Sequence, residues 1–103
     1  MKTLKDLKFS VIPTGGICGT CEIDNVNEIS VAMSENTYGG KSGLFEIVVF
    51  KSHDSSESVK LKCLSGGDVE GYLNLKEVEE KMIEIQKELG CDILDYNLED
   101  IYE

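Results

Sequence analysis

The sequence contains no arginine and no tryptophan, and it has one proline and one histidine among its 103 residues. Without arginine, the chain lacks the side chain best suited to two-pronged recognition of phosphate groups. The longest informative apolar run, Ile47 to Phe50, is far shorter than the ~20 residues that a membrane span needs. The histidine, His53, lies in a segment of serines and acids, and we interpret it as a solvated loop residue. These features argue against a phosphate-recognition motif, a membrane span and a histidine-based enzyme.

Negative charge dominates the composition. The net charge is −10, with six acids and five lysines in residues 1–53 but fourteen acids and five lysines in residues 54–103. A surface this negative repels phosphate backbones, so we expect no direct binding to nucleic acid or to anionic membranes. The N-terminus alternates charged and apolar residues, which is not typical of a signal peptide. We therefore expect a cytoplasmic protein whose four cysteines are thiols.

The patterning predicts a single domain of the α+β class over residues 1–103. Alternating or continuous apolar segments indicate strands at residues 7–12, 28–34, 44–51 and 58–64, and residues 22–24 are a further candidate strand start. Short connections between successive strands favour an antiparallel β-meander of about four strands. Residues 44–51 are apolar on both faces, so we expect this strand at the centre of the sheet with cover on both sides.

One main amphipathic helix is predicted at residues 74–89. Its apolar positions recur at intervals that place them on one face: Val78, Met82, Ile85 and Leu89. Asn74 and Glu77 have the spacing of a capping box, and Gly90 is a suitable residue to end the helix. After the helix, residues 91–103 either form a short second helix or fray. The apolar positions of that second helix would be Ile93, Leu94, Leu98 and Ile101.

Cys18 and Cys21 have the Cys-x-x-Cys spacing within a glycine-rich segment, Gly15–Cys21, which we expect to be an exposed loop. A redox pair needs its first cysteine at a helix N-terminus, and a zinc site needs two further ligands. Cys63 and Cys91 occur singly and resemble small buried hydrophobic residues. We therefore expect ordinary thiols that are optional for stability and no bound cofactor, with Cys18 and Cys21 as the alternative metal ligands.

The segment from Tyr38 to Gly43 contains a Gly-Lys-Ser triplet but does not predict a phosphate-binding loop. That motif requires a glycine five residues before the triplet, and position 35 is Glu35. The segment also precedes a predicted strand, whereas a phosphate-binding loop opens a helix. We interpret it as the turn of a β-hairpin.

Two sequence motifs carry a family resemblance. Residues 38–49 read Tyr-Gly-Gly-x-x-Gly-Leu-Phe-Glu-Ile-x-Val, and residues 67–73 read Gly-Asp-Val-Glu-Gly-Tyr-Leu before the capped helix. This combination resembles a group of small, uncharacterised bacteriophage and prophage proteins with a YGGxxGLYE strand and a DVxGYL strand-to-helix corner. The likeness covers roughly residues 25–89. It implies a mobile-element origin, names no activity and transfers no catalytic residue.

Two classes of function remain open, and we expect neither to be an enzyme. The first is a small acidic phage-type accessory protein that binds a host or phage protein with a basic surface and inhibits, for example, a nucleic-acid-handling or defence protein. The second is a small-molecule or zinc-binding protein that uses the Gly15–Cys21 and Tyr38–Gly43 segments. A homodimer is also left open. For the first class, the expected partner-binding residues lie on the helix and the tail: Glu80, Glu84, Glu88, Asp95, Tyr96, Glu99, Asp100 and Tyr102.

Overall fold

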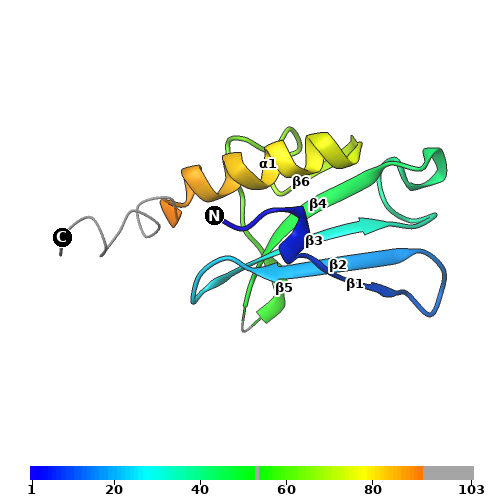
Figure 1. Cartoon of the computed structure of the whole chain (residues 1–103), viewed down its shortest axis with the longest axis horizontal. Helices are drawn as coiled ribbons and strands as arrows, with labels where there is room; N and C mark the ends of the chain where they lie inside the picture. Colours follow the sequence, from blue (N-terminus) through cyan, green and yellow to red (C-terminus); the bar gives the residue numbers. More distant parts are fainter. Residues whose placement is uncertain (53, 92–103) are drawn as a thin grey trace.

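The computed structural model describes residues 1–52 and 54–91. A six-stranded antiparallel sheet is packed on one face by a single long helix (Figure 1), which confirms the α+β class. The strands are β1 (Lys8–Val11), β2 (Ile17–Glu22), β3 (Asn27–Met33), β4 (Phe45–Lys51), β5 (Asp54–Ser58) and β6 (Val69–Leu73). The helix is α1 (Leu75–Glu88), and two short 3-10 helices are η1 (Leu4–Asp6) and η2 (Gly40–Ser42).

The first four strands form an antiparallel meander, each pairing with the next, but one of them, β2, lies where a loop was expected. The meander then departs from expectation, because β5 and β6 both pair with β4. β5 pairs with the end of β4 at Phe50 and Lys51, whereas β6 pairs with its first half, from Phe45 to Val48. Since β3 occupies the other side of β4, β5 and β6 share one edge of the sheet. β1 forms the opposite edge.

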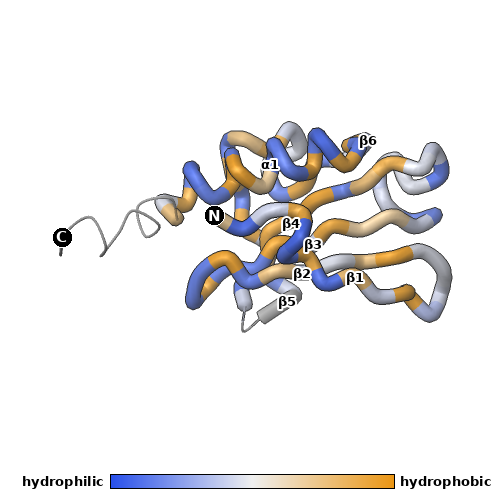
Figure 2. Tube along the Cα trace, in the orientation of Figure 1, coloured by the Kyte–Doolittle hydropathy of each residue, from blue (hydrophilic) through white to orange (hydrophobic). Residues whose placement is uncertain are grey.

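The core lies between α1 and one face of β3 and β4. Its fully buried side chains come from all three elements, namely Ile29, Val31, Ile47, Val49, Val78, Met82 and Ile85. Figure 2 shows hydrophobic and hydrophilic residues alternating along α1, which matches a helix with one buried face. On the other face of β4, Val48 and Phe50 are half-buried. The expected central place of this strand is confirmed, but full cover on both of its faces is wrong.

The predicted helix is confirmed almost to the residue. The Asn74 side chain accepts a hydrogen bond from the Glu77 backbone N–H at 2.8 Å, and the Glu77 carboxylate accepts one from the Asn74 N–H at 2.9 Å. Gly90 follows with a φ of 81°, the left-handed conformation in which glycine commonly ends a helix. Leu89, expected on the buried face, is half-buried. Gln86, which the pattern did not indicate, is 1% exposed.

The strand predicted at residues 58–64 is wrong. Residues 59–68 form hydrogen-bonded turns, in which the Gly67 N–H donates to the Leu64 carbonyl at 2.9 Å and the Leu61 N–H donates to the Gly67 carbonyl at 2.7 Å. The apolar residues that suggested a strand, Leu61 and Leu64, enter the core from these turns. The actual strands flank the predicted one, where polar or glycine-containing segments pair with β4.

The glycine-rich segment Gly15–Cys21 is also not a loop, because most of it forms β2. A tertiary contact requires glycine at position 19, because a Cβ atom there would lie 2.8 Å from the ring of Phe9 on the adjacent strand β1. The glycine thus allows an aromatic ring to lie directly over the strand. No pattern in the neighbouring sequence predicts that contact.

Candidate functional site

Two exposed tyrosines far apart in the sequence meet at the β6 edge of the sheet. Tyr38 is 60% exposed and Tyr72 is 63% exposed. The backbone N–H of Tyr72 donates a hydrogen bond to the Tyr38 carbonyl at 3.1 Å, so the two segments are joined directly. The two tyrosines border a surface hollow of about 450 Å³, whose lining also includes Asp68 and Gly71. We call this the tyrosine hollow. The two sequence motifs of the resemblance therefore come together in space.

Two glycines allow the backbones of Tyr38 and Tyr72 to approach each other this closely. A Cβ atom at Gly71 would collide with the Cβ and carbonyl oxygen of Tyr38, and one at Gly39 would lie 2.9 Å from the Tyr72 Cα. Glycine at both positions lets the two backbones touch. The Tyr38 N–H is in turn held by the Glu46 carboxylate at 2.7 Å. Tyr38 is therefore fixed through its backbone on both sides while its ring stays exposed.

Tyr72 has an unusual backbone conformation. Its φ of 59° lies in the left-handed region, where it is the only non-glycine residue among those the structure describes. The register explains why: Phe45 pairs with Leu73 and Ile47 pairs with Glu70, so β6 has one residue more than β4 in this interval. Such a β-bulge re-aims a side chain. A left-handed conformation costs an L-residue about 1–2 kcal/mol, and strain of this kind concentrates at functional sites.

A second hollow, of about 190 Å³, lies on the other side of β6 and is mainly acidic. Its lining consists of Glu70 and Leu73 from β6 and Glu77, Glu80, Lys81 and Glu84 from α1. We call this the acidic hollow. Glu80 and Glu84, two of the predicted partner-binding residues, are exposed here. The two hollows share no lining residue, but β6 contributes to both of them.

Lys81 is the cation of the acidic hollow, and the fold already uses it. Its Nζ atom lies 3.3 Å from Glu70 and 3.6 Å from Glu84, and it donates a hydrogen bond to the Cys63 carbonyl at 2.7 Å. Burial alone would lower the pKa of Lys81, but the hydrogen bond and charge of Glu70, with Glu84, raise it. Lys81 thus stays charged and turned into the fold, which leaves Glu80 and Glu84 at the surface.

Glu88 is placed differently from the other predicted glutamates. Its carboxylate accepts hydrogen bonds from the backbone N–H groups of Lys62 and Cys63, at 2.7 and 2.9 Å. These bonds, led by that of Lys62, lower the pKa of Glu88. Although Glu88 is exposed, it holds the 59–68 turns against α1, so its prediction as a partner-binding residue gains no support from its position. The other predicted residues, Asp95, Tyr96, Glu99, Asp100 and Tyr102, lie outside the described residues.

The cysteines do not converge. Three residues apart on a strand, Cys18 and Cys21 lie on opposite faces of β2. Cys21 is 8% exposed in the core, whereas Cys18 Sγ lies 3.4 Å from Ser30 Oγ on the other face. Cys91 is buried, as expected, whereas Cys63 is half-buried in the 59–68 turns. Burial, followed by the hydrogen bond with Glu88, raises the pKa of the Cys63 thiol to about 11.

The positions of the cysteines therefore give little support to a metal site. No group of three or more His, Cys, Asp or Glu side chains that could hold a metal ion occurs within residues 1–52 and 54–91. The expected loop is wrong, because the segment is a strand, and the alternative of Cys18 and Cys21 as joint metal ligands loses its basis, because the strand directs the two thiols apart. A single strand of alternating faces cannot bring residues i and i+3 to one ion.

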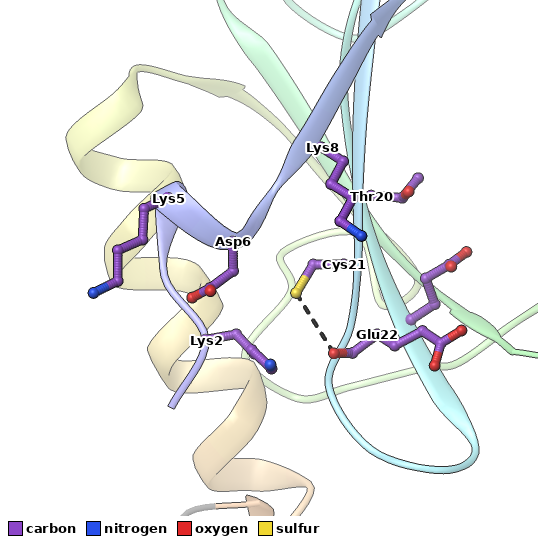
Figure 3. A pocket seen from close by; sticks show the side chains of 8 residues that line it. Lys2, Lys5, Asp6, Lys8, Thr20, Cys21 and Glu22 are labelled. Carbon is purple, nitrogen blue, oxygen red and sulfur yellow. Dashed lines mark hydrogen bonds between the residues drawn. The ribbon is translucent and has the colours of Figure 1, made fainter.

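A third hollow, of about 550 Å³, lies under the N-terminal segment (Figure 3). Lys2, Lys5 and Lys8 line it together with Asp6, Glu22 and Glu28. Figure 3 shows the Cys21 thiol directed toward this region, where it donates to the Glu22 carbonyl at 3.5 Å. Burial raises the pKa of this thiol. Because equal numbers of cations and anions line the hollow, its charge selects no particular ligand.

Comparisons of the chain with protein-family models, with curated proteins and with solved structures find no match. None of the helices in the described part of the chain is long and apolar enough to cross a membrane. We take the β6 edge as the candidate site because it combines two exposed tyrosines with a strained backbone. Sequence reasoning reached Glu80 and Glu84 through charge, and it noted the Tyr38 and Tyr72 motifs. It missed that the two motifs form one site, and the available signal was the glycine beside each tyrosine.

Proposed function

We propose that the protein is a small acidic accessory factor of phage type that acts in the cytoplasm by binding another protein rather than by catalysis. The proposed partner is a host or phage protein with a basic surface, for example a nucleic-acid-handling or defence protein that the binding inhibits. One observation carries the proposal. Two hollows that β6 helps to line carry two exposed tyrosines in one case and exposed glutamates in the other, and the cation beside the glutamates, Lys81, is engaged within the fold.

The physical argument combines charge with anchoring. A net charge of −10 favours encounter with a positive surface, and opposed potentials set orientation and speed association. Charge alone supplies little specificity at an exposed site. Tyrosines add large contact area at small entropic cost and are frequent anchors in protein interfaces. Tyr38 and Tyr72 supply that contribution beside Glu80 and Glu84.

The test uses the full chain as bait in a host lysate, followed by association kinetics with the captured protein. A charge-neutralised variant, Glu80→Gln with Glu84→Gln, Asp95→Asn and Glu99→Gln, should fold as well as the parent, associate more slowly and depend less on salt. For a comparison at equal charge, Glu80→Gln with Glu84→Gln is set against Glu22→Gln with Glu28→Gln, which alters two acids at the third hollow and should leave association nearly unchanged. If the captured protein has no basic surface, or if these two double variants bind alike at low salt, the proposal fails.

A second candidate is small-molecule binding at the Tyr38–Gly43 segment. The observation in its favour is the tyrosine hollow, because about 450 Å³ is within the ~300–1,000 Å³ typical of ligand pockets. The other half of this candidate loses its basis, since Gly15–Cys21 is mostly strand and directs its thiols apart. Native mass spectrometry of the purified chain distinguishes the two candidates. A stoichiometric added mass, of a metabolite or of zinc, would favour this one.

A further inference from the structure

We propose that the tyrosine hollow receives a cationic side chain, arginine or lysine, from a basic segment of the partner protein. This inference rests on the proposed function and specifies its chemistry. In this arrangement the cation lies against the rings of Tyr38 and Tyr72 and faces the carboxylate of Asp68, which lines the same hollow. Aromatic faces attract cations within about 6 Å of the ring centre, and guanidinium groups stack on them especially well.

The charges around the hollow favour a cation over other occupants. Its lining includes the carboxylate of Asp68 and no lysine. Ser58 Oγ donates to Asp68 Oδ2 at 3.2 Å, which orients this carboxylate at the wall of the hollow. The acidic hollow, which is also lined in part by β6, adds Glu77 and Glu80, and its Glu70 and Glu84 share the single cation Lys81. The net charge of the two hollows is negative, so it favours an arginine or lysine and repels an anion.

The backbone around the hollow is held in place, which also favours its use as a binding site for the cation. Tyr38 is held through its N–H by Glu46 and through its carbonyl by the Tyr72 N–H. Glycines at 39 and 71 bring the two backbones into contact. The strained conformation of Tyr72 keeps an aromatic ring exposed at a bulge, where a relaxed strand would continue its regular alternation. Because the backbones of both tyrosines are already held in place, a bound cation has to order only their side chains.

The experiment titrates the isotope-labelled full chain with a nine-residue Gly/Ser peptide carrying three arginines, followed by NMR. A second peptide carries citrulline at the same three positions, which removes the charge and keeps the shape. The arginine peptide should shift the amide resonances of Tyr38, Gly71 and Tyr72 at low salt. The citrulline peptide should bind at least tenfold more weakly.

Matched substitutions separate ring chemistry from apolar area. Tyr72→Phe keeps the aromatic face and should bind the arginine peptide within about twofold of the parent, whereas Tyr72→Leu should bind about fivefold more weakly. Tyr72→Gly should lose binding similarly but raise the melting temperature, because glycine adopts the left-handed conformation without strain. That combination of higher stability with weaker binding is not expected of a merely structural residue.

Failure of this inference is distinguishable from failure of the proposed function. If Tyr72→Leu and Tyr72→Phe bind alike, or if citrulline replaces arginine without loss, the hollow is not a cation receptor. In that case a loss of peptide binding in Glu80→Gln with Glu84→Gln would leave the acidic-face proposal standing. If the arginine peptide shifts no resonance at the β6 edge even at low salt, both proposals fail.

Discussion

The two ends of the sheet differ sharply in how well they are covered. Under α1, the side chains of Ile47 and Val49 on β4 are fully buried. On the same face at the other end, β1 leaves Phe9 42% exposed and Val11 77% exposed. A helix is about 10 Å across and strands lie about 4.8 Å apart, so one helix covers only two or three strands. The difference shows that a chain with a single long helix in its described part cannot enclose a sheet of this width.

The partly covered sheet has an energetic consequence. Stability concentrates at β3, β4 and α1, where the fully buried side chains meet. The β1 end is held through its ladder to β2 and through the Phe9 ring, which lies 6.2 Å from that of Phe45. Substitutions of similar chemistry should therefore have very different effects at the two ends.

Met82→Asp should have the largest effect. Met82 is fully buried under α1, and an unpaired charge there should cost on the order of 5 kcal/mol, enough to unfold a domain of ordinary stability. Val11→Asp introduces the same carboxylate at the exposed end and should change stability by about 0.5 kcal/mol or less. Chemical denaturation of both variants measures the contrast. A Met82→Asp variant that melts like the parent would show that α1 does not pack through this face.

Gln86→Leu should have the second largest effect. Gln86 is buried, and its side chain joins the N-terminal segment to α1 by hydrogen bonds. Gln86 donates to the Lys2 and Met82 carbonyls at 2.8 and 3.0 Å and accepts from the Lys2 N–H at 2.8 Å, which fastens the N-terminal segment beside α1 (Figure 1). Losing these bonds should cost about 2 kcal/mol and speed hydrogen exchange at residues 2–4. Lys87→Leu, at the exposed neighbour, is the control. Unchanged exchange at Lys2 would contradict this role.

Cys21→Ser and Cys18→Ser compare the two faces of β2. Cys21 lies in the core, and placing a hydroxyl there should cost about 1–2 kcal/mol. Cys18 lies near Ser30 Oγ on the half-exposed face, where a serine can keep the hydrogen bond, so its replacement should change stability by less than about 0.5 kcal/mol. The expectation that both thiols are optional is therefore revised for Cys21. Equal melting of the two variants would restore it.

Elements that local interactions specify were predictable from the sequence, whereas elements that depend on pairing with distant segments were not. α1 was predictable because its cap, its apolar face and Gly90 are all local signals. β3 was predictable from its alternation, and β4 from its continuous apolar run. β5 and β6 were not, since a Ser-rich segment and a Gly-Tyr segment become strands by pairing with β4. The tyrosine hollow was not predicted for the same reason: the glycines beside the two tyrosines are visible in the sequence, but each is required by a partner more than thirty residues away.

Glu88→Gln should have the smallest effect and a distinctive pH dependence. The carboxylate of Glu88 ties the 59–68 turns to the last turn of α1, at the edge of the covered region. Its pKa is lowered below the ordinary 4.5 in the folded protein, so its contribution to stability is present above pH 4.5 and is lost as the pH falls through the folded-state pKa. Glu88→Gln should therefore melt below the parent at pH 7, and the gap should close in acid.

Glu80→Gln provides the control for this last prediction, because Glu80 is an exposed residue of the same helix at the acidic hollow. Its melting temperature should match or slightly exceed that of the parent at pH 7, since removing one negative charge from a chain of net charge −10 reduces self-repulsion. The two glutamates would then divide by role, with Glu88 holding the fold and Glu80 free to meet a partner. A gap for Glu88→Gln that persists unchanged in acid would mean that its charge does not stabilise the turns, and Glu88 would rejoin the candidate binding residues.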